Sequence, residues 1–203
     1  MSQLAARLTP ATLRPLIAAQ MAQDAAHDWF HIERVFHNGL AIAATEDGVE
    51  EVVLRAALLL HDLGEKQPQG GNAPVRPDTI AGILRPLGVP EASIPPILTA
   101  INEHSYSQGR RPRSLESAIL QDADRLDAIG AIGIARAFAF GGARGRPLYD
   151  PDDPSSTVHH FHDKLLRLKD GMHTAEGRRL AERRHQHMQD FLAQFDAEWH
   201  GVT

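Results

Sequence analysis

Cysteine is absent from this chain of 203 residues. That absence excludes a disulfide framework, a zinc site built on thiolates and a thiol nucleophile. Aromatic residues are scarce, at 5% of the sequence, so we expect a core built mainly from Leu, Ile, Val and Ala. No apolar run approaches the roughly 20 residues that span a bilayer, and the first residues lack the apolar core of a signal sequence. We therefore expect a cytoplasmic protein that does not enter a membrane.

A strong excess of charge of one sign is also lacking. The 26 acidic and 21 basic side chains are mixed along the chain and give a net charge of −5. This balance argues against a stable nucleic-acid partner and against an anionic membrane surface as a partner. Histidine, in contrast, is abundant, with 12 residues. Because imidazole is the commonest protein ligand for metals, this abundance is a reason to look for a metal site.

Helical periodicity runs through nearly every long segment, and no segment indicates a strand. Two segments rich in Gly and Pro, residues 67–77 and 141–154, are expected to be loops. No segment looks like a domain boundary. The sequence therefore predicts an all-α protein with a single domain over residues 1–203, in which closing helices at 158–199 pack on a core of about 24–140. Helices are expected to begin at Pro10, Asp28, Glu50, Pro77, Pro90, Ser114, Val158 and Thr174, and the Ser114 helix is expected to continue through residues 128–140.

Candidate metal ligands lie in three of the predicted helices. An apolar run over residues 58–60 ends in His61 and Asp62, and His31 lies in the middle of an earlier helix. Carboxylates inside an apolar helix are unfavourable unless they are paired or bind a ligand. Two imidazoles and two carboxylates would suit a divalent ion such as Mn²⁺, Fe²⁺, Co²⁺, Ni²⁺ or Zn²⁺ and leave positions open for water and substrate. Three such carboxylates interrupt one later helix: Asp122, Asp124 and Asp127.

The His-Asp dipeptide alone is not diagnostic. It also occurs at residues 27–28 and 162–163. A single histidine in a helix is more often a hydrogen-bonded or exposed residue than a ligand. No spacing within the sequence shows that the three helices meet.

The ordered set is more specific than the dipeptide. His31, then His61-Asp62, then the string at residues 123–126 resembles the H…HD…D pattern of the HD-domain superfamily of metal-dependent phosphohydrolases. Residues 57–66 and 121–131 resemble one bacterial branch of small stand-alone hydrolases, and the resemblance runs from about residue 24 to about 198. It implies an all-α helical bundle of the HD-domain type with one metal ion at its centre. It also implies hydrolysis of a phosphate ester or anhydride, with a nucleotide as the expected substrate.

The resemblance assigns the metal ligands. Carried over residue by residue, they are His31, His61, Asp62 and Asp124. Helical spacing from the apolar positions of the third helix favours Asp122 as the inward carboxylate, whereas the family pattern selects Asp124. We follow the pattern, and the choice between the two stays open at this point. The expected cofactor is one divalent ion: Mn, Ni, Co, Fe, Zn or Mg.

Four further residues are candidates for handling water and substrate. In related hydrolases a carboxylate just after the HD pair orients or deprotonates the attacking water, which points to Glu65, with Asp62 as the other catalytic carboxylate. Lys66 is a candidate for neutralising phosphate charge. His104 either holds a substrate phosphate, protonates a leaving group or binds a second metal. Arg34 either faces the same cavity, as a substrate contact, or forms an ion pair with one of the aspartates.

The function predicted from the sequence is that of a metal-dependent phosphohydrolase acting on a small phosphorylated molecule. It acts either as a phosphomonoesterase or by releasing pyrophosphate from a triphosphate. One alternative is an HD-fold di-iron oxygenase, which requires additional histidine ligands. Another is a non-catalytic protein that senses nucleotides. The oligomeric state, including a homodimer, stays open.

Overall fold

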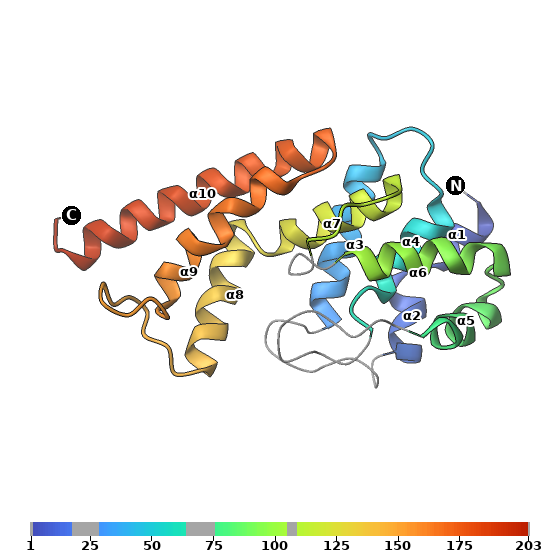
Figure 1. Ribbon diagram of the computed structural model, residues 1–203, viewed down its shortest axis with the longest axis horizontal. Coiled ribbons are helices and arrows are strands. Elements are labelled where there is room, and N and C mark those ends of the chain that lie inside the picture. Colours follow the sequence, from blue (N-terminus) through green and yellow to red (C-terminus); the bar gives the residue numbers. More distant parts are fainter. Residues whose placement is uncertain (1, 18–28, 64–75, 105–108, 203) are drawn as a thin grey trace. The chain divides into compact units, whose positions relative to one another are not determined.

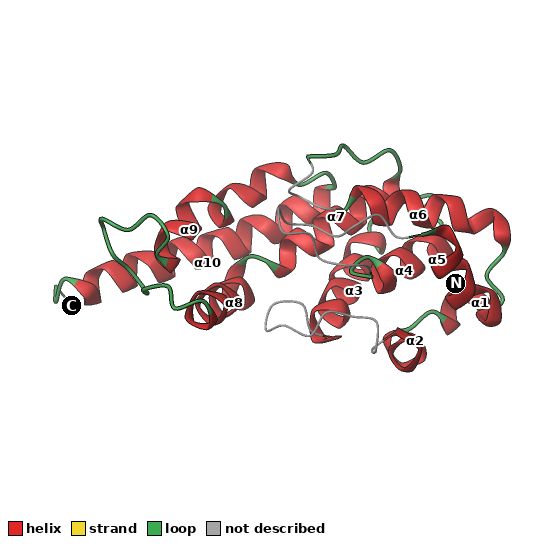
Figure 2. Cartoon of the chain, turned by 60° about the horizontal axis from the view of Figure 1, so that its bottom comes forward, coloured by secondary structure: helices red, strands yellow, loops and turns green. Residues whose placement is uncertain are grey.

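The computed structural model describes residues 2–17, 29–63, 76–104 and 109–202, and its elements there are all helical (Figure 1, Figure 2). The predicted all-α class is therefore confirmed. The α-helices are α1 (Gln3–Arg7), α2 (Pro10–Ile17), α3 (Trp29–Ala43), α4 (Glu51–Leu60), α5 (Pro77–Leu84), α6 (Ile94–Glu103), α7 (Leu115–Asp127), α8 (Gly130–Ala143), α9 (Thr157–Asp163) and α10 (Ala175–Trp199). Among the described residues, three 3₁₀ helices also lie between α-helices: η2 (Arg85–Leu87), η3 (Glu91–Ser93) and η5 (Leu165–Gly171).

The chain forms two compact units, Met1–Asp124 and Arg125–Thr203, and the division falls inside α7. A single domain over the whole chain stays a prediction. Within the described ranges, no single helix is both long and apolar enough to span a bilayer.

Helix α4 is the centre of the first unit. It packs against α1, α3 and α6, while α5 packs on α6 and α2 packs on α3. Seven of its ten residues are buried, which is what a helix that is apolar on nearly every side requires. The surrounding core consists mainly of Leu, Ile, Val and Ala, as expected from the scarcity of aromatic residues.

A close approach between α3 and α4 depends on one glycine. Gly39 is buried in α3, and a Cβ added to it would lie 2.5 Å from the Leu58 Cδ2 atom of α4. Leu58 itself is fully buried. The absence of a side chain at Gly39 therefore sets the distance between the helix that carries His31 and the helix that ends in His61.

Hydroxyl caps begin three of the predicted helices at the expected places. Thr9, Ser114 and Thr174 each accept a hydrogen bond from the backbone N–H three residues later, at 3.3, 3.1 and 2.9 Å. Each side chain satisfies a backbone donor that has no partner in the first turn of a helix. Pro77 likewise begins α5, and Gly88, with φ +85°, ends the short 3₁₀ helix that follows it.

Other predicted helix boundaries were wrong. The helix expected from Pro90 begins as a 3₁₀ turn, and α6 starts only at Ile94. The two prolines that follow Ile94 have no N–H, so they suit the first turn of a helix. The predicted helix at 158–172 breaks at Lys164 (φ −134°, ψ −58°) and continues as 3₁₀ helix. The helix predicted from Ser114 also breaks, because α7 ends at Asp127 and α8 begins at Gly130, which has φ +74°. Asp28, the expected start of α3, lies outside the described residues.

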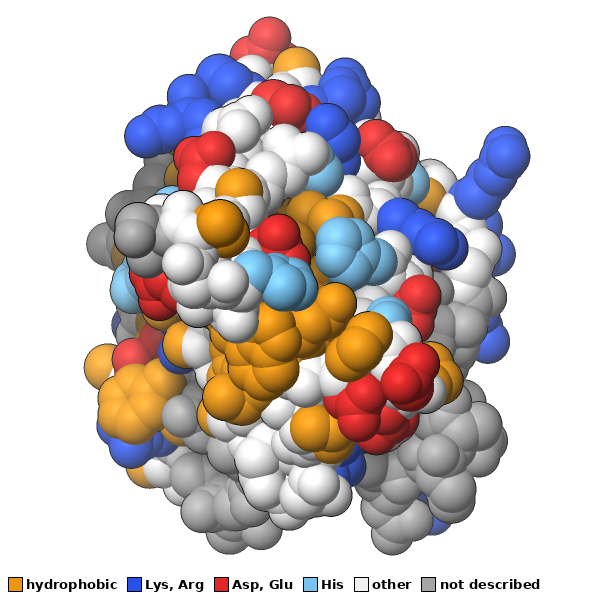
Figure 3. Space-filling model, turned by 90° about the vertical axis from the view of Figure 1, so that its left-hand side faces the viewer, with side chains coloured by type: hydrophobic (Ala, Val, Ile, Leu, Met, Phe, Trp, Pro, Cys, Tyr) orange, Lys and Arg blue, Asp and Glu red, His pale blue; other side chains and the backbone are white. Residues whose placement is uncertain are grey.

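The second unit is organised around α10, which packs against α8 and η5. Aromatic rings from α8, α9 and α10 contact one another, and Trp199 stacks on Phe195 with ring centroids 5.7 Å apart. Figure 3 shows hydrophobic side chains gathered into a patch with histidines beside it. A groove of about 400 Å³ is lined by Tyr149, Val158, His159, His162, Leu192, Ala193, Phe195 and Asp196.

Candidate metal centre

His61 lies at the C-cap of the central helix α4. The last carbonyls of a helix have no partner within it, and the His61 Nδ1 atom bonds one of them, the Leu58 oxygen, at 2.9 Å. Because a carbonyl only accepts hydrogen bonds, the proton lies on Nδ1 and the lone pair on Nε2. The side chain is 1% exposed, and this burial lowers the pKa of His61 to about 4. His61 is therefore a neutral imidazole with Nε2 available, which is the form that binds metals.

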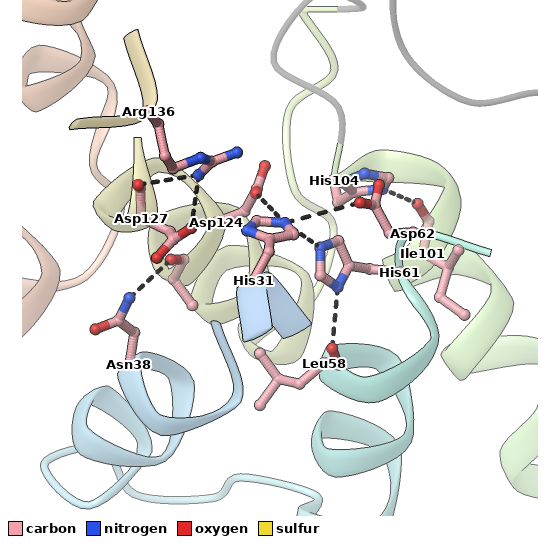
Figure 4. A network of polar contacts seen from close by, with 11 residues as sticks. His31, Asn38, Leu58, His61, Asp62, Ile101, His104, Asp124, Asp127 and Arg136 are labelled. Carbon is pink, nitrogen blue, oxygen red and sulfur yellow. Dashed lines mark hydrogen bonds and ion pairs between the residues drawn. The ribbon is translucent and has the colours of Figure 1, made fainter. Parts of the chain in front are cut away.

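The Nε2 atom of His31 faces the same point. It lies 3.2 Å from His61 Nε2, 3.8 Å from Asp62 Oδ2 and 3.5 Å from Asp124 Oδ1. Figure 4 shows these four side chains converging from α3, the end of α4 and α7. The three helices that the sequence could not bring together therefore meet at this cluster.

The distances can be compared with what one shared ion requires. Two ligand atoms that each bind an ion at about 2.1 Å lie between about 3 Å apart, when adjacent, and about 4.2 Å apart, when opposite. All three distances measured from His31 fall in that interval. Ligand atoms of His31, His61 and Asp62 also lie within 4.8 Å of one another. The donor set and its spacing therefore fit a divalent metal ion.

The two carboxylates of the cluster differ in exposure. Asp62 is 6% exposed and Asp124 is 26% exposed. Burial opposes ionisation of Asp124, but the neighbouring His31, His61 and His104 hold the pKa of its carboxyl below the ordinary value. A carboxylate that stays ionised and reaches solvent can hold a cation while leaving access for a small molecule.

Asp122, the alternative fourth ligand, is more deeply buried than Asp124. It is fully buried, as its helical spacing predicted, but Asp124 is the carboxylate 3.5 Å from His31. The third carboxylate of α7, Asp127, forms an ion pair with Arg136 of α8 at 2.6 Å, within the second unit. The geometry thus favours Asp124, and its role as a ligand stays a prediction.

His104 joins the cluster from α6. It is the C-cap of that helix, and its Nδ1 atom donates to the Ile101 carbonyl at 2.5 Å. Its ring centroid lies 5.1 Å from that of His61, with the two rings at 76°. His61 and His104 are therefore built alike: each is buried, ends its helix and bonds the carbonyl three residues before it.

Of the other three predicted site residues, only Arg34 is among the described residues. Arg34 lies in α3 one turn after His31 and is half-buried, so its predicted role stays a prediction. Glu65 and Lys66 lie outside the described residues.

One supporting residue was missed. Asn38 of α3 donates from Nδ2 to the Ala123 carbonyl of α7 at 3.3 Å. It lies seven residues after His31, two turns along the same helix face, and Ala123 directly precedes Asp124. This bond holds the two ligand-bearing helices in register. The spacing from His31 was the only signal in the sequence.

Comparison with known proteins agrees with this geometry. The HD domain family matches residues 29–129. The uncharacterized protein YpgQ of Bacillus subtilis is 38% identical over 185 residues, which cover 89% of this chain and 88% of YpgQ. A crystal structure of YpgQ in complex with ADP has a TM-score of 0.79 at 33% identity and covers 96% of this chain and 100% of that one. An HD-superfamily hydrolase of Bacillus thuringiensis has a TM-score of 0.75 at 35% identity, over 97% and 96% of the two chains. The chain therefore belongs to the HD-domain superfamily, with the fold of an HD-superfamily hydrolase.

Proposed function

We propose that this protein is a metal-dependent phosphohydrolase that acts on a nucleotide, at a phosphate ester or a phosphate anhydride bond. The observation that carries the proposal is the convergence of His31, His61, Asp62 and Asp124, with the Nε2 atoms of the two histidines 3.2 Å apart. These four residues would hold one divalent ion. A bound ion of this kind supplies Lewis acidity and lowers the pKa of a water molecule.

The side chains of this protein would orient the metal ligands, the attacking water and the substrate. The backbone bond of His61 keeps its lone pair directed at the cluster, and Asp62 supplies a buried negative charge beside it. We propose Glu65, three residues after Asp62, as the group that orients the attacking water or takes its proton. His104 is proposed as a substrate contact, because its ring lies next to His61.

Basic side chains are needed to offset charge on the phosphoryl oxygens. Lys66 and Arg34 are our candidates. Lys66 follows Glu65 directly, and Arg34 lies one turn after His31. An ion pair between Arg34 and one of the aspartates is the alternative role for that side chain.

A nucleotide is proposed as the substrate because a relative binds one. The YpgQ structure contains ADP, and this chain aligns with that structure over nearly its whole length. The resemblance does not distinguish a phosphomonoester from a triphosphate, so the test must cover both.

The test is a screen for released phosphate and pyrophosphate. Nucleoside mono-, di- and triphosphates would be incubated with the purified protein and Mn²⁺, Ni²⁺, Co²⁺ or Mg²⁺ in parallel. Asp62→Ala is expected to lose both Mn²⁺ binding, measured by calorimetry, and hydrolysis, while its circular dichroism spectrum stays helical. Asp163→Ala is a matched control, because it removes the aspartate of another His-Asp pair, one that is exposed at the end of α9. It should keep both properties.

Three outcomes would contradict the proposal. Full activity and metal content in Asp62→Ala would show that the site is elsewhere. Two iron ions per chain together with oxygen consumption would favour an oxygenase. Nucleotide binding that stabilises the protein without any turnover would favour a sensor.

A further inference from the structure

We propose that Gln121 is a positioning residue for His104. The inference rests on the proposed function, in which His104 contacts the substrate, and it adds a residue that is not part of the H…HD…D ligand pattern. Gln121 is buried in α7, one turn before Asp124. Its helix, α7, carries Asp124 to the metal cluster, but the side chain of Gln121 forms a hydrogen bond with the end of α6, next to His104.

The amide of Gln121 reaches the backbone on both sides of His104. Its Nε2 atom donates to the Glu103 carbonyl at 2.8 Å and to the Arg110 carbonyl at 3.1 Å. Glu103 is the last residue of α6, so its carbonyl has no partner within the helix. Gln121 thus caps α6 from a neighbouring helix, at the residue directly before His104.

A second contact fixes the same helix end through a side chain. The Glu103 carboxylate is buried and accepts a hydrogen bond from Ser117 Oγ at 2.6 Å and from the Arg113 backbone N–H at 3.1 Å. Ser117 and Gln121 lie four residues apart, on one face of α7, and Asp124 follows three residues later. One helix face therefore holds the end of α6 and presents Asp124 to His31.

The ring of His104 depends on this helix end. It is held by its own bond to the Ile101 carbonyl, which keeps the proton on Nδ1 and the lone pair on Nε2. If the Gln121 amide is removed, the carbonyl of Glu103 loses a donor and the last turn of α6 loosens. His104 then leaves its single orientation and its single tautomer.

The first test needs no enzymatic activity. The full chain, labelled with ¹⁵N-histidine, would be compared as wild type and as Gln121→Leu, at a pH where the imidazoles are neutral and without added metal. His104→Ala identifies the His104 signals. In the wild type we expect the pattern of a proton fixed on Nδ1, and in Gln121→Leu a mixture of tautomers. Unchanged His104 signals in Gln121→Leu would overturn the proposal.

The second test separates positioning from a general loss of structure. We expect Gln121→Leu to lower kcat/KM by about 10- to 100-fold, which is the scale of a misplacement of about 1 Å, on the nucleotide that the wild type hydrolyses fastest. In the His104→Ala background the same substitution should change kcat/KM by less than about 2-fold, because two residues that act through one interaction are not additive. An equal loss in both backgrounds would mean that Gln121 has only a structural role.

A matched control is available in α10. Gln186 is exposed and also donates from Nε2, to Asp190 at 2.9 Å, so Gln186→Leu is the same substitution at an exposed site and should change neither measurement. If Gln121→Leu does not fold, Gln121→Asn, which withdraws the amide by one methylene, replaces it in both tests. A wild type that hydrolyses no nucleotide refutes the proposed function, and the tautomer test still decides the role of Gln121.

Discussion

Substitution of Gly39 by alanine tests the packing that brings the two histidine-bearing helices together. A Cβ at this position would lie 2.5 and 2.6 Å from the two methyl carbons of Leu58, and Leu58 is fully buried, so any shift of its side chain displaces neighbours in the core. Overpacking of this kind typically lowers the free energy of unfolding by about 1–3 kcal/mol. A helical glycine replaced by alanine otherwise raises it by up to about 1 kcal/mol.

Gly82 gives the matched control. It is exposed in α5, and a Cβ added there would meet nothing within 4 Å. Both substitutions gain the same helix propensity, so the difference between their free energies of unfolding isolates the packing term. Measured by equilibrium denaturation in urea, Gly82→Ala should stabilise the protein, and Gly39→Ala should be about 1–3 kcal/mol less stable than Gly82→Ala. Equal stabilisation by the two substitutions would refute the close approach of α3 and α4.

The same pair of variants links packing to the metal centre. The Leu58 carbonyl accepts the hydrogen bond that orients His61, so a displaced Leu58 should disturb that ring. Calorimetric titration with Mn²⁺ should therefore show weaker binding for Gly39→Ala than for the wild type, and unchanged binding for Gly82→Ala. Weaker binding in both variants would mean that the effect does not pass through Leu58.

Three further outcomes are expected. The folded-state pKa of His61, about 4, lies below the ordinary 6.5, so the unfolded chain binds more protons than the folded protein between these pH values. The free energy of unfolding of the metal-free protein should therefore fall by up to about 3 kcal/mol as the pH falls from 6.5 to 4. Urea unfolding along this range should show a smaller fall for His61→Gln than for the wild type. Gly130 has φ +74°, so Gly130→Ala should lower the free energy of unfolding by about 1–2 kcal/mol, whereas Gly142→Ala, in open space on the same helix, should not. Arg136→Met removes an ion-pair partner of the buried Asp127 and should lower the free energy of unfolding by about 3 kcal/mol or less. Adding Asp127→Asn removes the unpaired charge and should restore part of that loss. If the double variant is no more stable than Arg136→Met, the ion pair does not contribute to stability.

The starts of several helices could be predicted because the capping interactions that mark them involve residues close in sequence. A threonine or serine hydroxyl reaches an N–H three residues away, so the start of a helix is recorded within four residues of sequence. The break at Lys164 has no such local mark. Residues 158–172 keep an apolar pattern across the break, and their packing against α8 and α10 involves residues far along the chain. Periodicity therefore predicted one helix where the structure has an α-helix followed by a 3₁₀ helix.

The placement of His104 was beyond any local signal. Its neighbours in sequence do not show that α4 and α6 end side by side, which is what brings its ring to His61. The long-range bonds from Gln121 to the Glu103 carbonyl and from Ser117 to the Glu103 carboxylate join segments 14 or more residues apart. Such contacts depend on the orientation of α7 relative to α6, which cannot be predicted from a single sequence.

The choice between Asp122 and Asp124 shows why periodicity is a poor guide to a ligand. Hydrophobic spacing reports which helix face is buried, and it correctly placed Asp122 there, at 0% exposure. A site that must admit a substrate lies at the edge of the core, where Asp124 keeps 26% exposure. Burial alone therefore does not distinguish the two carboxylates, and the geometry favours Asp124, whose Oδ1 atom lies 3.5 Å from His31. The ordered family pattern also predicts Asp124, and the bond from Asn38 to the Ala123 carbonyl is a physical contact that holds this part of α7 against the helix of His31.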